Sequence, residues 1–140
     1  MKLSKSTKLV SLLLVSTLLL SMPLIIEQAL KYYQNNTLSQ EESIINDLKT
    51  LASSGDNSAA FLLATAYKNG KLGVVNFEKA FYWYKEAAQR GDKDSMLMLG
   101  WIYYKGSESI SIDSKKAKHW FSKAANEGVD EAVEMLELLR

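Results

Sequence analysis

The sequence predicts an all-α protein, a short α-solenoid of antiparallel helix pairs preceded by an N-terminal hydrophobic helix. Two observations predict this architecture. Glycine recurs at Gly55, Gly91 and Gly128 with the surrounding pattern repeated, so the period is 36 and then 37 residues. A fixed period of this size is typical of solenoids, in which each helix pair buries its apolar face only against its neighbours. The second observation is an uncharged apolar run over residues 9–26.

One sequence pattern occurs in two consecutive complete copies, and a third copy begins near the C-terminus. Each copy holds small and aromatic residues at helical spacing, a short loop, an Asn or Asp, and a second helical pattern ending in glycine. The first copy carries Leu63, Ala64, Tyr67, Gly70, Asn76, Lys79, Ala80, Trp83, Tyr84, Ala87, Ala88 and Gly91. The second carries Leu99, Gly100, Tyr103, Gly106, Asp113, Lys116, Ala117, Trp120, Phe121, Ala124, Ala125 and Gly128. The third opens with Ala132 and Leu136.

The shared motif is A-x-x-x-L-G-x-x-Y-x-x-G, a short loop, and D-x-x-K-A-x-x-W-Y/F-x-x-A-A-x-x-G. It resembles the Sel-one-like repeat (SLR), a branch of the tetratricopeptide-type helical repeats, over roughly residues 48–140. The chain departs from the motif where Ala64 and Glu137 occupy the position of Gly100, and where Ser95 replaces an alanine. The resemblance implies a right-handed stack of antiparallel helix pairs that acts as an adaptor or scaffold.

Residues 1–30 are predicted to form a signal anchor or transmembrane helix. Lys2, Lys5 and Lys8 precede the apolar run, and its eighteen residues would span about 27 Å as a helix, close to the ~30 Å hydrocarbon core. The positive-inside bias places the N-terminus in the cytoplasm and the repeats outside. A cleaved secretory signal is one alternative, although its apolar region usually has about 7–15 residues before a small-x-small site. A buried helix of a soluble protein is another.

Residues 31–38 are predicted to be a linker. Pro23 is expected to bend or end the preceding helix because it has no N–H to donate, and Tyr32 and Tyr33 could serve either as an aromatic belt or as ordinary linker residues. Ser39 and Glu42 have the spacing of a capping box. It predicts a capping helix over 40–53, the lone second helix of a degenerate repeat, ended by a left-handed glycine at position 55.

The solenoid proper is predicted over 39–140, with one repeat at 56–91, a second at 92–128 and a partial repeat at 129–140. The helices expected in the first repeat cover 57–69 and 77–90, those in the second cover 93–105 and 114–127, and the last covers 129–139. Asn76 and Asp113 have the position of N-caps, and glycines 91 and 128 that of C-cap residues. Alanines in the second helix of each repeat allow close helix approach, and Trp83 and Trp120 are interpreted as packing residues.

Composition excludes several kinds of function. From Glu27 onward, 14 basic residues face 16 acidic ones, a net charge of −2, so no basic footprint for nucleic acid is predicted. The chain has no cysteine and one histidine, His119, which makes a zinc site very unfavourable. The acids Asp92, Asp94, Asp130 and Glu131 are interpreted as helix-start residues that favour the helix dipole. No catalytic constellation, metal site or cofactor is predicted, and the chain is interpreted as a non-enzyme.

One face of the helix over 114–127 is strongly basic. It carries Lys115, Lys116, Lys118, His119, Ser122 and Lys123, opposite the apolar positions. A solvated outer face explains this stripe, and contact with anionic headgroups or an acidic partner is the alternative.

The first helix of each repeat has a second apolar or aromatic face. In the second repeat this face carries Leu97, Trp101 and Tyr104, and in the first repeat Phe61, Thr65 and Lys68 have the equivalent positions. Either flanking helices cover it on both sides, or it lines a concave groove of the kind that solenoids use for binding. These six residues are the candidate partner-binding site.

The predicted function is therefore protein–protein interaction, as a membrane-anchored SLR adaptor or scaffold on the extracytoplasmic side. By the resemblance, the expected location is a bacterial inner membrane, held by residues 9–26, with the repeats in the periplasm. With a cleaved signal the chain would be soluble in the periplasm. One alternative function is an immunity protein that neutralises an antibacterial effector, and another is an accessory subunit of an envelope enzyme.

Overall fold

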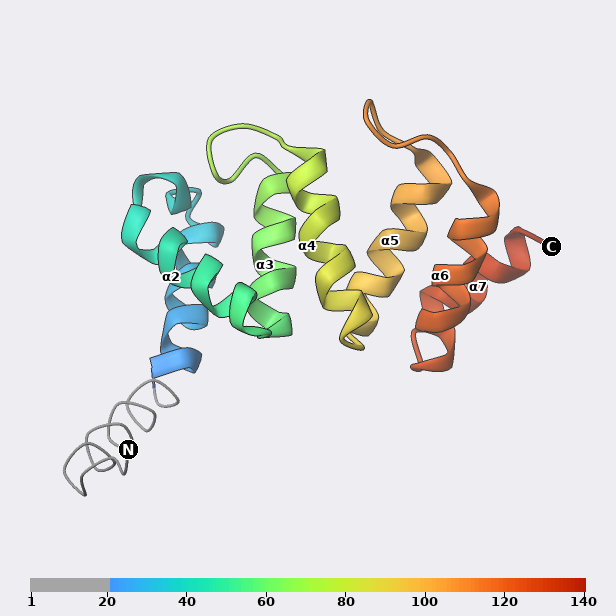
Figure 1. Ribbon diagram of the computed structural model, residues 1–140, viewed down its shortest axis with the longest axis horizontal. Coiled ribbons are helices and arrows are strands. Elements are labelled where there is room, and N and C mark those ends of the chain that lie inside the picture. Colours follow the sequence, from blue (N-terminus) through green and yellow to red (C-terminus); the bar gives the residue numbers. More distant parts are fainter. Residues whose placement is uncertain (1–20) are drawn as a thin grey trace, which may run out of the picture.

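The computed structural model describes residues 21–140, and these are helical with connecting turns and contain no strand (Figure 1). The predictions for residues 1–20, including most of the apolar run, lie outside the described residues. Residues 21–34 form a helix, and residue 21, the first described residue, is already helical. The further elements are η1 (Leu38–Gln40), α2 (Glu42–Ser54), α3 (Asn57–Lys68), α4 (Phe77–Gln89), α5 (Lys93–Lys105), α6 (Ser114–Asn126) and α7 (Asp130–Leu138).

The helices form a row in which each packs on the next along the chain, from α2 to α7 (Figure 1). The helices predicted in the two repeats are confirmed, and each end falls within one residue of its expected place. Of the six alanines predicted to allow close approach, Ala80, Ala87, Ala117 and Ala124 are fully buried and Ala88 is nearly so, whereas Ala125 is half-buried. Trp83 and Trp120 pack against the same core but remain half-buried. The fully buried rings are those of their chain neighbours, Tyr84 and Phe121.

Local capping chemistry fixes where the repeat helices begin and end. The side chains of Asn76 and Asp113 accept the backbone N–H groups of Lys79 and Lys116 at 2.9 and 3.0 Å, so both predicted N-caps are confirmed. The cap bond from the Lys116 backbone N–H lowers the pKa of the Asp113 carboxyl below its ordinary value. Gly55 ends α2 in the left-handed conformation, with φ 105°, as predicted.

Gly100 permits a close approach within the second repeat. A Cβ atom at this position would lie 2.5 Å from ring carbons of Phe121. The ring therefore packs directly on the backbone of α5. The motif requires glycine at position 100 because Phe121, on the second helix of the same repeat, occupies the space that a side chain would need.

The capping box predicted at Ser39 and Glu42 is wrong. Helix α2 begins at Glu42, its N-cap is Glu41, and no side chain bonds to the cap. Ser39 instead lies within the 3-10 turn η1. The reason is tertiary, because Leu38 is fully buried and this burial fixes the turn ahead of the helix.

The linker predicted over 31–38 is also wrong in its first half, because the chain stays helical from residue 21 to residue 34. Pro23 does not end this helix. Proline removes a donor to the turn before it and clashes there, whereas the residues after it can remain helical. Ala29 is fully buried, and Met22, Ile25 and Ile26 pack against the core of the array.

Helix 21–34 is the first helix of a degenerate repeat whose second helix is α2. Asn69 Nδ2 of α3's C-cap donates to Tyr33 Oη at 2.6 Å, and Lys71 Nζ donates to Asn36 Oδ1 at 2.8 Å. Asn36 has a φ of 61°, close to the 69° and 71° of the two glycines that follow the first helices of the full repeats. The prediction that the capping helix stands alone is therefore wrong, because α2 is half of a helix pair.

No helix among residues 21–140 combines the length and the apolar character that crossing a membrane requires.

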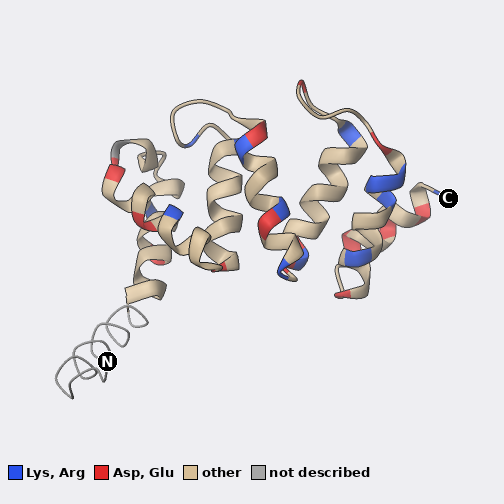
Figure 2. Ribbon diagram, in the orientation of Figure 1, with Lys and Arg blue, Asp and Glu red and all other residues tan. Residues whose placement is uncertain are grey.

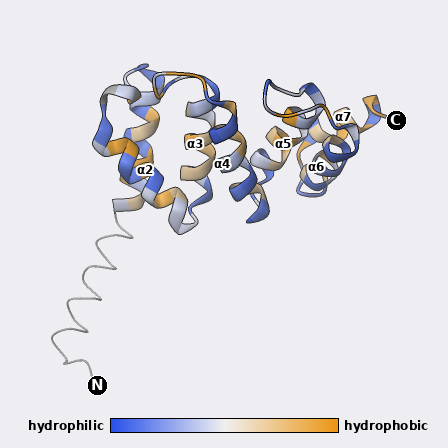
Figure 3. Ribbon diagram, turned by 45° about the horizontal axis from the view of Figure 1, so that its top comes forward, coloured by the Kyte–Doolittle hydropathy of each residue, from blue (hydrophilic) through white to orange (hydrophobic). Residues whose placement is uncertain are grey.

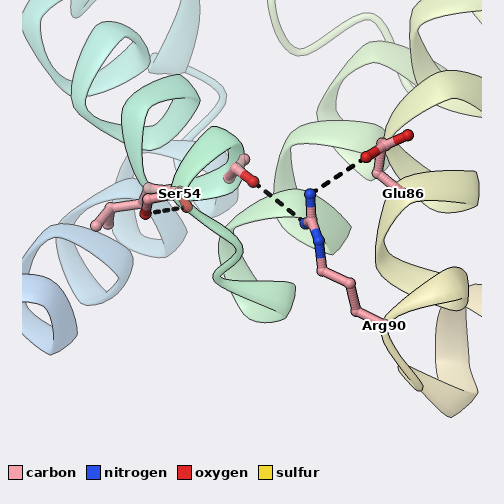
Figure 4. Close-up of polar contacts among 5 residues, drawn as sticks. Ser54, Glu86 and Arg90 are labelled. Carbon is pink, nitrogen blue, oxygen red and sulfur yellow. Dashed lines mark hydrogen bonds and ion pairs between the residues drawn. The ribbon is translucent and has the colours of Figure 1, made fainter.

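An arginine ties the end of α4 to the end of α2 (Figure 4). Arg90 Nη1 donates to the carbonyl oxygen of Ala52 at 3.3 Å, and its Nη2 lies 3.2 Å from Glu86 Oε2. Glu127 occupies the equivalent position one repeat later, so this link belongs to the N-terminal part of the array.

Candidate partner-binding groove

The first helices of successive repeats present one shared face, which we call the groove face. It is formed by helix 21–34, α3, α5 and α7, and it contains two cavities. All six residues predicted to form the groove lie on α3 and α5 and are half-buried, and at helical spacing each set of three shares one side of its helix.

The first cavity has a volume of about 370 Å³ and lies between helix 21–34, α3 and the start of α5. Its apolar wall is formed by Ile26, Leu30 and Phe61. Asp92 and Asp94, at the start of α5, supply its only charged lining side chains among the described residues. The cavity is therefore an apolar hollow with an acidic rim.

The second cavity has a volume of about 410 Å³ and lies between the ends of α3 and α5 and the start of α7. Met98, Trp101 and Ile102 form its apolar wall. Its charged lining residues are Lys68, Lys105 and Glu131. The rim of this cavity thus carries two cations and one anion.

The six predicted groove residues divide between these cavities. Phe61 and Thr65 line the first, and Lys68 and Trp101 line the second. Leu97 and Tyr104 line neither. Leu97 packs against the core, and the ring of Tyr104 makes an edge contact with Trp101, with centroids 5.7 Å apart.

Sequence reasoning misses the whole wall that helix 21–34 contributes to the first cavity, because it divides Ile26, Leu30 and Tyr33 between an anchor and a linker. The signal that could find them is Tyr33 and Asn36, which repeat the spacing of Tyr67 and Gly70 at an interval of 34 residues. Sequence reasoning also treats Glu131 only as a helix-start acid, and the structure places it in the second cavity.

Trp101 is held by contacts on several sides. Its Nε1 donates to Glu131 Oε1 at 2.8 Å, and its ring meets Phe121 edge-on at 5.7 Å. Lys105 Nζ lies 4.6 Å from the centre of the indole ring, within cation–π distance. The indole therefore presents a fixed, partly exposed apolar surface in the second cavity.

Thr65, at the equivalent position of the first repeat, faces inward. Its Oγ1 shares a hydrogen bond of 2.8 Å with Tyr84 Oη, and the ring of Tyr84 contacts Phe61 edge-on at 5.6 Å. Burial raises the pKa of the Tyr84 hydroxyl to about 12, against the opposing effect of the Thr65 bond. The first cavity is thus backed by a part-buried hydrogen bond between Thr65 and the fully buried Tyr84.

The basic stripe lies exposed on α6 (Figure 2). This helix is the second of its repeat, whereas the groove face is built from first helices. Some charges of the stripe have internal partners. Lys116 Nζ lies 3.2 Å from Asp113 Oδ2, and Lys123 Nζ lies 4.9 Å from the centre of the Trp120 ring. His119 is exposed beside Trp120, with ring centroids 5.5 Å apart. A solvated outer face and an anionic contact both fit this arrangement.

Of the acids predicted at the helix starts, Asp92 caps its own helix, whereas Glu131 accepts the indole N–H of Trp101. Asp92 is the N-cap of α5, and its Oδ1 accepts the backbone N–H of Ser95 at 2.7 Å. In residues 21–140, no group of three or more His, Cys, Asp or Glu side chains could hold a metal ion.

This fold defines a class of protein, the helical-repeat array, in which the first helices of successive repeats share one face. The family model for the Sel1 repeat matches residues 57–92 and 93–129, and the chain belongs to this family. The matched units begin one residue later than the repeats assigned from the glycine period. No curated protein matches the chain significantly.

Several solved structures are similar to this chain, and two of them illustrate the likeness. A Sel1 repeat protein from Oxalobacter formigenes is 37% identical, with a TM-score of 0.59, over 64% of this chain and 67% of that one. A protective antigen present in uropathogenic Escherichia coli strains, which displays an SLR fold, is 27% identical with a TM-score of 0.64. That match covers 71% of this chain, which spans about a fifth (21%) of the antigen's length. Both proteins are bacterial.

Proposed function

We propose that this chain is a non-enzymatic protein–protein interaction module that binds a partner on its groove face. The observation that carries the proposal is the pair of apolar cavities, because contiguous apolar hollows with polar rims are typical of binding surfaces. Sel1 repeat proteins typically act as scaffolds of this kind. A half-buried indole at the second cavity adds the type of side chain that often dominates binding energy.

The groove face is also continuous. On α3 the stripe of Phe61, Thr65 and Lys68 runs from the first cavity to the second. On α5 a second stripe runs from Asp94 in the first cavity to Trp101 in the second. Two parallel ridges therefore join the hollows, and this arrangement supports one partner segment that occupies both.

A matched pair of variants tests this function. Ser58 is exposed and lines the first cavity, whereas Ser122 is exposed on α6. Ser58→Arg should fill the cavity without disturbing the core, and Ser122→Arg adds the same side chain elsewhere. In affinity purification from detergent-solubilised cells, the partner should be retained by the wild type and by Ser122→Arg but lost by Ser58→Arg. Retention by all three chains would contradict the proposal.

We further propose that the repeats act outside the cytoplasm. Lys2, Lys5 and Lys8 followed by an apolar run is the layout of an export segment. The array already uses residues 21–26 of this run, because Met22, Ile25 and Ile26 pack on its core. The remaining 12 residues, 9–20, would span about 18 Å as a helix, against a core of roughly 30 Å. This short length supports a secretory signal and argues against the full membrane-spanning helix that the sequence favours.

Location and processing can be measured separately. A reporter enzyme fused after Arg140 should be active only outside the cytoplasm, and activity inside would contradict export. The mass of the chain from purified envelopes then distinguishes a removed signal from a retained anchor. The retained partner of the wild type distinguishes an adaptor role from the immunity and envelope-enzyme alternatives.

A further inference from the structure

We propose that the groove binds a peptide segment of fixed polarity, with an apolar anchor beside a basic residue in the first cavity and an apolar anchor beside an acidic residue in the second. This inference rests on the proposed function and adds the chemistry of the partner and its direction on the groove face. Charge complementarity of this kind selects partners and fixes their register more than it adds affinity.

The first cavity lacks an internal cation for its acids. One oxygen of Asp92 is engaged by the Ser95 backbone N–H, which leaves the other oxygen available. Asp94 is exposed and forms no ion pair within residues 21–140. Its equivalent one repeat earlier is Ser58, so the acid is particular to this cavity and does not belong to the repeat pattern.

The second cavity has the opposite balance. Lys68 and Lys105 form no ion pair among the described residues, whereas Glu131 accepts the indole N–H of Trp101. The two lysines come from α3 and α5 and have different repeat positions, since the equivalents are Tyr104 for Lys68 and Asn69 for Lys105. A carboxylate placed between them would meet cations from both helices.

Helix dipoles account for part of this charge distribution, since acids favour helix starts and lysines favour helix ends. They do not account for the apolar hollow beside each charged group. Helices α3 and α5 each end with a basic residue that lines the second cavity, whereas the basic residue in the last turn of α6, Lys123, lines neither groove cavity. Figure 2 shows a basic residue at the end of α5 that leads into the loop before α6.

The helix geometry sets the spacing of the partner's charges. Asp94 and Lys105 are 11 positions apart on α5, which corresponds to about 16 Å along the helix axis. An extended chain covers this distance in about five residues. A bound extended segment should therefore carry its basic and acidic residues about five positions apart, each beside an apolar residue.

The test is selection from a phage-displayed library of random twelve-residue peptides on the full-length chain in detergent. The wild type should enrich peptides with an apolar–basic pair and an apolar–acidic pair at about this spacing. The double variant Lys68→Glu/Lys105→Glu should reverse the preferred charge only at the acidic residue of the peptide, which binds the second cavity. Asp94→Lys should reverse it only at the basic residue of the peptide, which binds the first cavity. Lys118→Glu, on exposed α6, should change neither preference.

A synthetic peptide from the wild-type selection sharpens the result. Its affinity should fall about three- to tenfold for Lys68→Glu/Lys105→Glu, as expected for lost exposed and partly desolvated ion pairs. Replacing the acidic residue of the peptide with lysine should restore binding to that variant alone. Circular dichroism of each variant verifies that the array is folded.

The outcomes separate the two proposals. If no peptide is enriched, or if the enriched peptides still bind Ser58→Arg, then the groove function and the polarity both fail. If groove-dependent peptides are enriched without any charge preference, only the polarity is overturned.

Discussion

The two complete repeats share one skeleton but fill it differently around the second face of their first helices. In the first repeat, Thr65 bonds to the buried hydroxyl of Tyr84 at 2.8 Å. In the second repeat, Trp101 stands at the position of Thr65 and Phe121 at that of Tyr84. Phe121 has no hydroxyl to satisfy, and the indole N–H of Trp101 bonds to Glu131 on α7, the first helix of the following partial repeat.

The difference teaches that one repeat position can serve either the core or the surface. Where a buried hydroxyl needs a partner, a small polar residue on the first helix supplies it, and an unpaired hydroxyl there would be costly. Where the buried ring is apolar, this constraint is absent and the position can hold an aromatic side chain directed to a cavity. The replacement of Ala64 by Gly100 completes the exchange, because it lets the Phe121 ring approach the helix.

Among the variants that test this difference between the repeats, Gly100→Ala should lower the free energy of unfolding most. The new Cβ would lie 2.5 Å from the Phe121 ring, and overpacking of this kind costs about 3 kcal/mol. Urea denaturation should show a lower free energy of unfolding. In the matched variant Ala64→Gly only about 1 kcal/mol should be lost, chiefly through helix propensity. A more stable Gly100→Ala chain would refute the close contact.

High pH should destabilise the array through Tyr84. The pKa of its hydroxyl is about 12 in the folded chain, against an ordinary value of 10.0. The unfolded chain therefore releases the proton first as pH rises above 10. Stability should be unaffected by this group below pH 10 and should fall by roughly 2 kcal/mol as pH rises from 10 to 12. Urea denaturation across this interval should show a shallower decline for Tyr84→Phe.

Tyr84→Phe itself should cost about 1 kcal/mol at neutral pH, the value of one hydrogen bond plus the unsatisfied hydroxyl of Thr65. The double variant Thr65→Val/Tyr84→Phe removes both partners and should recover part of that loss, as a double-mutant cycle would measure. Strict additivity of the two single variants would show that the hydroxyls are not coupled.

Trp101→Phe should have the smallest effect on stability, below about 0.5 kcal/mol, because the Glu131 bond is exposed. It should nevertheless weaken partner capture at the second cavity, since it removes the bond that orients the ring. Affinity purification of the variant with thermal unfolding in parallel measures both effects. A large loss of stability would instead make Trp101 a core residue like Tyr84.

Apolar side chains outside the groove show why the cavities, and not exposure alone, identify the site. Val74 and Val75 are 73% and 53% exposed in the loop between α3 and α4 (Figure 3). Val75 and Phe77 line a smaller hollow of about 260 Å³ whose other residues are mostly polar. This loop therefore lacks the apolar walls that both groove cavities have.

The sequence by itself determined the parts of this protein whose cause is local. The N-caps Asn76 and Asp113, the left-handed glycines and the helices of both repeats follow from interactions between residues three or four positions apart, which a single sequence displays. The stripe of Phe61, Thr65 and Lys68 is likewise visible in the sequence, because helical period alone places these side chains on one face.

Only the tertiary structure decided that helix 21–34 belongs to the array, that the groove face holds two cavities and that Trp101 meets Glu131. Each of these depends on residues about 30 or more positions apart, such as Tyr33 with Asn69 and Trp101 with Glu131. An apolar run can be buried equally well by lipid or by neighbouring helices, so its composition does not say which. The packing of Ile25 and Ile26 against the core decides it for the described end of that run.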